Sequence, residues 1–294
     1  MFYRRKVILA MFQIFDGELD KIRLQKLLFL FTQQQSKAEY NFVPYRFGCY
    51  SYSANADLTT MVSKGMLQEH EHHFCIKDRT DYFTQLKPED RLLMQSLKNE
   101  YGRMTPKALM QHVYRNFPFY AINSEAAENI LNKEELKKIE VARPTSNNTI
   151  LFTIGYEGIS PEEYLVRLIS NDVKVLVDVR RNALSMKYGF SKQQLMKFCR
   201  NLGIEYLHIP EVGIESDLRQ ELKSQSDYDK LFEIYRAGTL KKNISAQKKI
   251  FDLLKEKQRI ALTCFEANID QCLRKHLSEA IAKLPQFEFE VKHI

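Results

Sequence analysis

The stretch ILFTIGYEGISPEEYLVRLISNDVKVLVDVRR, residues 150–181, holds two apolar segments with an amphipathic segment between them. ILFTIG (150–155) and VKVLV (173–177) are short and apolar, which is typical of buried strands. SPEE, at 160–163, is typical of a helix start, because serine caps free amide groups and carboxylates favour the helix dipole. A strand, a helix and a second strand in this order predict a parallel β-α-β unit.

The alternation of strand and helix continues to the end of the chain. We therefore expect an α/β domain over residues 150–294, with a mostly parallel sheet and flanking helices. Further helices are predicted at 191–203, 228–240, 246–257 and 269–284, further strands at 204–207, 259–263 and 287–294, and a long connection after Gly213.

Residues 1–143 have a mainly helical pattern instead. Helices on both sides of a short β wing suggest a winged-helix-like module, and the proline and polar run at 144–149 marks the domain boundary. The predicted elements are helix through the first 40 residues, a helix over 57–64 capped by Ser53 or Asn55, a hairpin over 70–86, and helices over 88–104 and 105–117.

The overall composition indicates a globular protein, and its 294 residues are enough for two domains. The formal charge of +7 favours an anionic partner such as nucleic acid, because lysine and arginine release counterions from phosphates. The sequence has no apolar run long enough to span a membrane and no cleavable leader, so we expect no membrane partner and a cytoplasmic location. Five scattered cysteines predict reduced thiols.

Reactive side chains follow the predicted strands at their carboxyl ends. Because ligands bind outside the carboxyl ends of parallel strands, these side chains are expected to meet at one cleft. They are Tyr156 and Glu157 after the first strand, Asp178 with Arg180 and Arg181 after the second, His208 after the third, and Cys264 with Glu266 after the fourth.

Asp178 at the end of an apolar strand needs a partner, and the adjacent Arg180 and Arg181 cannot both supply it. One arginine is expected to pair with Asp178 and the other to bind a phosphate or carboxylate. Tyr156 either stacks on a planar ligand or packs over the sheet edge, and packing is favoured. Glu157 is either a general base or a helix cap.

Cys264 is a candidate nucleophile, although a buried structural cysteine is the favoured interpretation. Glu266 is the better acid or base, and a Glu157–Glu266 pair would suit chemistry at a glycosidic bond. The histidines of HEHH, at 70–73, lack a cysteine or carboxylate at metal-site spacing and indicate a solvated wing tip. No metal site and no cofactor are predicted, since no dinucleotide, P-loop or zinc-deaminase motif is present.

The second half resembles the bacterial family called domain of unknown function 488. The resemblance rests on TIGYEG (153–158), DVRRNALS (178–185), GIEYLHIPEVG (203–213), and CFE with QCLRKHL in the last quarter. It implies an α/β fold with a polar pocket, without an established activity. Tyr206, His208, Cys272, Arg274 and His276 complete the candidate ligand-binding set. The family pattern leads us to expect a histidine directly after the cysteine, whereas here His276 stands four residues after Cys272, a spacing at which the two side chains share a helix face and a pairing is expected instead.

Residues 21–67 resemble the Panacea type of antitoxin and phage-associated domain, through RLQKLLFLF and the aromatic turn FGCYS. This resemblance implies a role in defence or stress. Two functions stay open. The first is an enzyme, such as a hydrolase or an enzyme of glycosidic bonds, that acts on a nucleotide, a nucleic-acid base or a related phosphorylated ligand. The second is a non-catalytic, ligand-sensing regulator that binds DNA or a protein partner.

Overall fold

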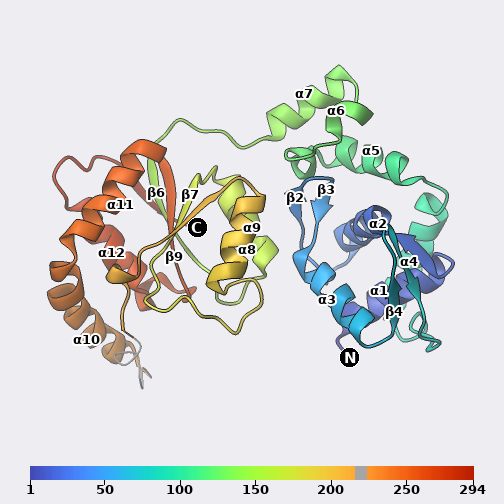
Figure 1. The fold of residues 1–294 in the computed structure, drawn as a ribbon, viewed down its shortest axis with the longest axis horizontal. Helices are drawn as coiled ribbons and strands as arrows, with labels where there is room; N and C mark the ends of the chain where they lie inside the picture. Colours follow the sequence, from blue (N-terminus) through green and yellow to red (C-terminus); the bar gives the residue numbers. More distant parts are fainter. Residues whose placement is uncertain (216–223) are drawn as a thin grey trace. The chain divides into compact units, whose positions relative to one another are not determined.

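The structure is a computed structural model that describes residues 1–215 and 224–294. Contacts within the chain divide it into two compact units, Met1–Arg143 and Pro144–Ile294 (Figure 1). Among the helices that the structure describes, none is both long enough and apolar enough to cross a membrane.

The N-terminal unit is mostly helical and contains two small antiparallel sheets. A three-stranded sheet has the order β1-β5-β4, and β2 and β3 form a hairpin. Helix α1 is apolar on every side along residues 7–12, so it is buried at the centre of the unit. The elements are α1 (Tyr3–Ile14), β1 (Glu18–Asp20), α2 (Lys21–Gln34), β2 (Val43–Tyr45), β3 (Gly48–Tyr50), α3 (Tyr52–Ser63), β4 (Leu67–Glu69), β5 (His73–Ile76), α4 (Pro88–Tyr101), α5 (Pro106–Asn116), α6 (Ala127–Ile130) and α7 (Lys133–Ala142).

Several boundaries predicted for this unit are wrong. The first 40 residues form two helices instead of one, because Asp16 and Gly17 adopt positive φ angles of 68° and 86° and turn the chain into β1. Ser51 caps α3 through the amide of Ala54, ahead of the expected Ser53 or Asn55. The predicted hairpin begins three residues earlier, so that residues 70–72 form its turn. The predicted cap Thr105 of α5 is confirmed, since its side chain accepts from the amide of Ala108.

The C-terminal unit confirms the predicted α/β class. The five strands that the structure describes in this unit are all parallel and have the order β10-β6-β9-β7-β8. The elements are β6 (Ile150–Gly155), α8 (Pro161–Ser170), β7 (Val175–Asp178), α9 (Lys192–Asn201), β8 (Glu205–His208), α10 (Gln225–Tyr235) with a π-helical turn (Arg236–Leu240), α11 (Ile244–Lys257), β9 (Arg259–Cys264), α12 (Leu273–Ala282) and β10 (Glu290–His293).

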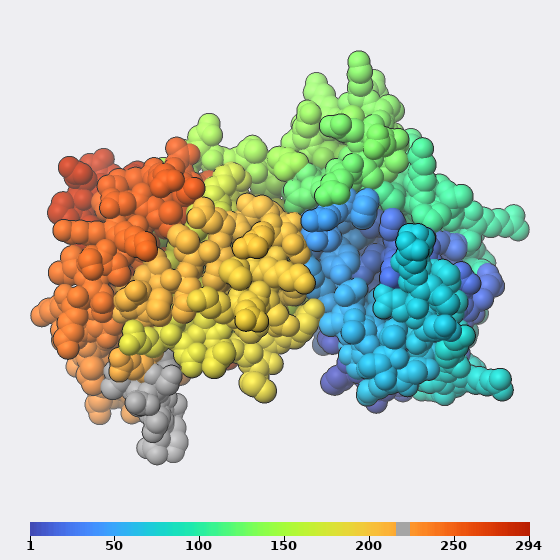
Figure 2. Space-filling model, viewed as in Figure 1, coloured from blue at the N-terminus to red at the C-terminus, as the bar shows by residue number. Residues whose placement is uncertain are grey.

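Helices cover both faces of this sheet. Helices α8 and α9 lie on one face, and α11 and α12 on the other (Figure 1). Leu151, Val177 and Leu262 point from three strands into the core shared with α10, α11 and α12. In the space-filling view, most of the visible surface of this unit is yellow to red, the colours of the residues that follow β7 (Figure 2).

Local sequence explains where the helices of this unit begin. The predicted SPEE start of α8 is confirmed, because Ser160 accepts from the amide of Glu163 and Pro161 occupies the first turn. Helix α12 begins four residues later than predicted, with Cys272 as its extended N-cap residue. The connection predicted after Gly213 includes residues 216–223, which lie outside the described residues.

Candidate functional site

The predicted reactive residues meet at the carboxyl edge of the parallel sheet. Strand register places Gly155 beside Cys264, and Asp178 beside both Thr263 and His208. The loops that follow β6 and β9 are joined, since the amides of Tyr156 and Glu157 donate to the Phe265 carbonyl at 3.1 and 2.9 Å. Four segments therefore form one site, although the first and the last of them are more than a hundred residues apart in the sequence.

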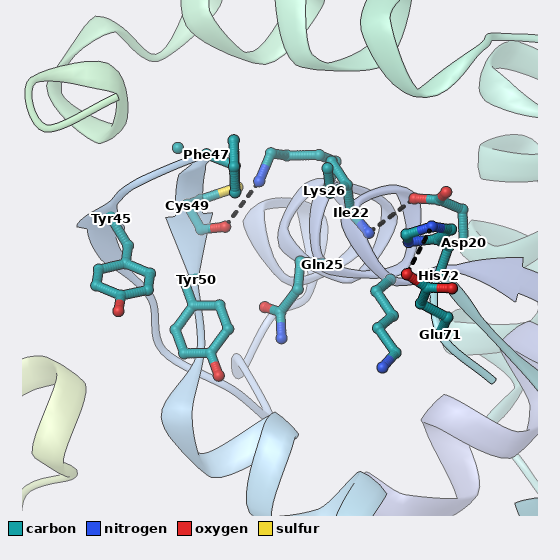
Figure 3. A pocket seen from close by; sticks show the side chains of 12 residues that line it. Asp20, Ile22, Gln25, Lys26, Tyr45, Phe47, Cys49, Tyr50, Glu71 and His72 are labelled. Carbon is teal, nitrogen blue, oxygen red and sulfur yellow. Dashed lines mark hydrogen bonds and ion pairs between the residues drawn. The ribbon is translucent and has the colours of Figure 1, made fainter. Parts of the chain in front are cut away.

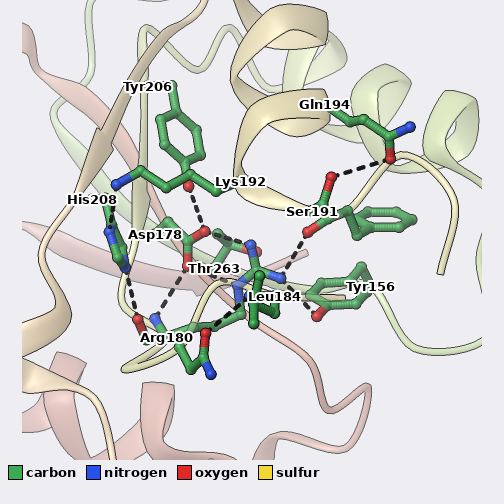
Figure 4. Close-up of polar contacts among 12 residues, drawn as sticks. Tyr156, Asp178, Arg180, Leu184, Ser191, Lys192, Gln194, Tyr206, His208 and Thr263 are labelled. Atoms are coloured by element: carbon green, nitrogen blue, oxygen red, sulfur yellow. Dashed lines mark hydrogen bonds and ion pairs between the residues drawn. The ribbon is translucent and has the colours of Figure 1, made fainter. Parts of the chain in front are cut away.

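A buried ion pair between Asp178 and Arg180 lies at the centre of this edge (Figure 4). The Arg180 guanidinium donates to both carboxylate oxygens, from Nε at 2.8 Å and from Nη2 at 2.5 Å. Tyr206 adds a hydroxyl bond of 2.6 Å to the same carboxylate. The remaining nitrogen of Arg180, Nη1, donates to the Tyr156 hydroxyl and to the Phe190 carbonyl at 2.7 and 2.9 Å. Every charged group in this network has a partner, as burial requires.

The network holds Arg180 charged and Tyr206 protonated. Burial opposes the charge of Arg180, but the hydrogen bonds and charge of Asp178 outweigh it and raise the arginine pKa above its ordinary value. Burial, reinforced by Asp178, also raises the pKa of Tyr206 above its ordinary value. Asp178 is fully buried, and its carboxylate already accepts hydrogen bonds from Arg180 and Tyr206.

Tyr156 and His208 support this centre from two sides. The Tyr156 ring stacks on Phe190 with a centroid distance of 4.3 Å and is only 3% exposed, which agrees with the favoured packing interpretation. His208 Nδ1 lies 3.0 Å from the Lys192 ammonium, which can only donate, so Nε2 carries the proton and donates to the Arg180 carbonyl at 2.9 Å. Both residues therefore position Arg180.

Arg181 lies at a pocket of about 260 Å³ beside this network. Its side chain is 45% exposed, and its contacts to the Pro210 carbonyl and the Glu215 carboxylate are long, at 3.5 and 3.4 Å. Of the two adjacent arginines, Arg180 thus serves the ion pair and Arg181 faces the pocket. The pocket is lined by Tyr156, Arg180, Arg181, Asn182, Leu184, Ser185, Ile214 and Phe265.

A second cluster lies where β9 meets α12. The thiols of Cys264 and Cys272 both donate to Glu266 Oε2 at 3.2 Å. Arg274, which is 2% exposed, donates from Nε to the Cys272 sulfur at 3.0 Å and from Nη2 to the Glu266 carbonyl at 2.5 Å. Burial and the neighbouring Cys264 raise the pKa of Cys272, which keeps this thiol protonated. Cys264 is fully buried, as the favoured interpretation of this residue predicts.

The carboxylates of Glu157 and Glu266 have separate hydrogen-bond partners. That of Glu157 accepts from the Ala267 amide at 3.0 Å, whereas that of Glu266 is bonded to the two thiols. His276 does not pair with Cys272, because Cys272 precedes the helix and the assumed helical spacing fails. The imidazole of His276 lies against Phe232 and the Arg236 guanidinium instead, and burial lowers its pKa.

The pocket contains residues that the sequence did not single out. Phe265, at 41% exposure, follows the end of a strand just as Tyr156 does. This shared position could have identified Phe265 as a candidate site residue from the sequence. Asn182 and Ser185 belong to the quoted DVRRNALS motif, in which only Asp178 and the two arginines were assigned roles. Lys187 also had no assigned role, although its ammonium donates to the Tyr156 carbonyl at 2.6 Å.

The chain matches no curated protein. A family model does match residues 160–281, from the start of α8 to the last turn of α12. This match supports the resemblance predicted for the second half, while the Panacea resemblance of residues 21–67 stays a prediction. The C-terminal unit thus contains a region that matches the family described as Domain of unknown function DUF488.

Proposed function

We propose that the C-terminal unit binds a nucleotide-like anionic ligand in the pocket beside Arg181. The observation that carries the proposal is the difference between the environments of Arg180 and Arg181. Arg180 uses its guanidinium within the protein, whereas Arg181 is half exposed at the pocket, and its contacts with the described residues are 3.4 Å or longer. A half-exposed guanidinium with such long contacts can bind a phosphate or carboxylate through two hydrogen bonds.

The rest of the lining suits a small planar group attached to the anion. Phe265 offers an exposed aromatic surface for stacking, a role that packing denies to Tyr156. Asn182 and Ser185 add hydrogen-bonding groups. A cavity of about 260 Å³ is close to the lower size limit of small-molecule sites, which favours a single base or nucleotide over a large cofactor.

Arg181→Ala is expected to weaken the binding of this ligand by roughly 10- to 100-fold, the usual worth of hydrogen bonds to a charged group. The measurement is a thermal-shift screen with nucleotides, nucleobases and sugar phosphates, followed by calorimetry on any ligand that raises the melting temperature. Arg200→Ala is the matched control, because Arg200 is an exposed arginine on α9 outside the pocket lining. Equal affinities of the two variants would refute the role of Arg181.

The lining favours a ligand-sensing regulator over an enzyme. Among the described residues that line the pocket there is no carboxylate, imidazole or thiol, so the groups that usually transfer protons lie outside it. Asp178 is saturated by its partners. A sensor requires only that ligand binding bias a conformation, and the pocket supplies the binding groups for this.

The enzyme is the second candidate, because Glu266 directly follows Phe265 and Glu157 belongs to the loop that is hydrogen-bonded to the Phe265 carbonyl. One of these carboxylates would then act as acid or base on the bound ligand, in a hydrolase or a reaction at a glycosidic bond. Glu157→Gln and Glu266→Gln separate the two functions. In a regulator both variants keep the ligand-induced thermal shift and no turnover exists to lose, whereas in an enzyme one variant loses turnover while still binding.

The N-terminal unit is proposed to bind the partner of this regulator. The β4-β5 hairpin beside helices supports the winged-helix-like interpretation, and the excess of 21 lysines and arginines over 17 aspartates and glutamates in residues 1–143 supports nucleic acid. The unit also has an apolar pocket of about 350 Å³ between α2, the β2-β3 hairpin and the β4-β5 turn, lined by Tyr45, Tyr50 and Phe47 among others (Figure 3). Affinity for duplex DNA should fall steeply with salt, and affinity without salt dependence would favour a protein partner at this pocket instead.

A further inference from the structure

The solvent face of the three-stranded sheet in the N-terminal unit carries an unusual group of side chains. Residues directly opposite each other on antiparallel strands point to the same face. Register places Glu18 of β1 opposite Cys75 of β5, and the amide of His70 donates to the carbonyl of His73 at the start of the hairpin turn. His73 and Cys75 are two residues apart on one strand, so they also share a face. Glu18, His70, His73 and Cys75 therefore gather on one surface.

Their side chains are already close to one another. The imidazoles of His70 and His73 stack with a centroid distance of 4.4 Å, and His73 Nε2 lies 3.4 Å from Glu18 Oε1. One ligand atom each from His70, His73 and Cys75 can be chosen so that all three lie within 4.8 Å of one another. Burial and the neighbouring Glu18 carboxylate raise the pKa of the Cys75 thiol.

We propose that His70, His73, Cys75 and Glu18 form a zinc site that joins β1, β5 and the β4-β5 turn. Two imidazoles, one thiolate and one carboxylate are the donors that tetrahedral zinc prefers. The thiol releases its proton on binding, and zinc with one thiolate and one carboxylate leaves the site neutral. The ligand atoms of His70, His73 and Cys75 already lie within 4.8 Å of one another, so rotations of these partly exposed side chains can bring them to zinc-binding separations.

The opposite face of the sheet fixes this arrangement. Leu19, Leu67 and Phe74 alternate with the ligand positions and are buried in the core of the unit at 5% exposure or less. The strands therefore cannot slip in register without exposing that core. The proposed ligands thus start from a rigid scaffold, and only side-chain rotations are needed to close the site.

The C-terminal cluster of Cys264, Glu266 and Cys272 is the rival location, since its ligand atoms also lie within 4.8 Å of one another. There, however, the buried Arg274 guanidinium donates to the Cys272 sulfur and occupies the position next to the would-be ion. A cation at that place would meet a fixed positive charge at short range. The sheet of the N-terminal unit is therefore the better site.

The test uses the full chain without a histidine tag, loaded with zinc and then dialysed, with metal content measured by mass spectrometry. We expect one zinc ion per chain in the unaltered protein, loss of most of it in Cys75→Ser and His73→Gln, and retention in His72→Gln. His72 is the matched control, since it belongs to the same turn but is largely exposed and pairs with Glu71 (Figure 3). Circular dichroism checks that each variant is folded.

Cobalt substitution distinguishes the two clusters. Cobalt bound to a thiolate gives a charge-transfer absorption in the near ultraviolet, which Cys75→Ser should abolish and Cys272→Ser should leave in place. The proposal is overturned if the unaltered chain retains no zinc, if Cys75→Ser retains as much as the unaltered chain, or if Cys272→Ser abolishes the cobalt absorption.

Discussion

Asp178→Ala is expected to destabilise the C-terminal unit by about 3–5 kcal/mol, because it leaves the Arg180 charge buried without its counterion. The side chains of the pair are 0% and 6% exposed, so water cannot replace the lost carboxylate. Tyr206 would lose its acceptor in the same step. The chain has no tryptophan, so the measurement is hydrogen exchange by mass spectrometry, in which the amides of β6, β7 and β9 report the opening of this unit.

A surface pair of the same unit supplies the control. Glu163 and Arg167 form an exposed ion pair on α8 with a distance of 2.8 Å, and Glu163→Ala should cost no more than about 1 kcal/mol. The double variant Asp178→Ala with Arg180→Met should recover much of the loss, since it removes the unpaired charge. A loss as small in Asp178→Ala as in Glu163→Ala would show that the buried pair does not hold the site together.

Gly155→Ala is expected to disrupt the junction between the β6 and β9 loops, at a cost of about 3 kcal/mol. A methyl group at this position would collide with the Glu266 carbonyl and come within 2.8 Å of the Arg274 guanidinium. Backbone and a buried arginine cannot move aside easily, so Glu266 and its two thiol donors would be displaced. Increased exchange at residues 264–268 and faster reaction of Cys264 and Cys272 with a thiol reagent would report this change.

Gly238→Ala is the matched substitution for comparison. Gly238 lies in the π-helical turn after α10, a methyl group there would meet nothing within 4 Å, and its φ is not positive. Alanine should therefore be neutral or slightly stabilising. If Gly155→Ala were equally well tolerated, the two strand-end loops would not be packed as closely as the structure shows.

The fold of the second half was predictable because its signals are local. The central strands β6, β7 and β9 are short apolar runs, and the serine and proline before α8 determine where that helix begins. The meeting of Tyr156, Asp178 and Cys264 at one edge followed from the parallel order alone. Helix starts were less reliable where no cap is encoded, and the late start of α12 at Leu273 removed the predicted contact between Cys272 and His276.

The sequence could not decide whether Arg180 or Arg181 pairs with Asp178, although the alternating direction of side chains in an extended segment favoured Arg180. Residues two apart in an extended chain point the same way, which associates Asp178 with Arg180. The chain leaves the strand at Asp178, however, so this spacing alone could not assign the pair. The gathering of His70, His73 and Cys75 needed the register between strands, and the predicted hairpin was displaced by three residues.

The guanidinium of Arg180 affects ligand binding, because it holds both ends of segment 178–190, which borders the pocket. It binds Asp178 where the segment begins and the Phe190 carbonyl where it ends, and Lys187 fastens the middle to Tyr156. Asn182, Leu184 and Ser185 are therefore held in place before any ligand arrives. The entropy of ordering these groups has already been lost in folding, so a small ligand can bind here with little further ordering of the protein.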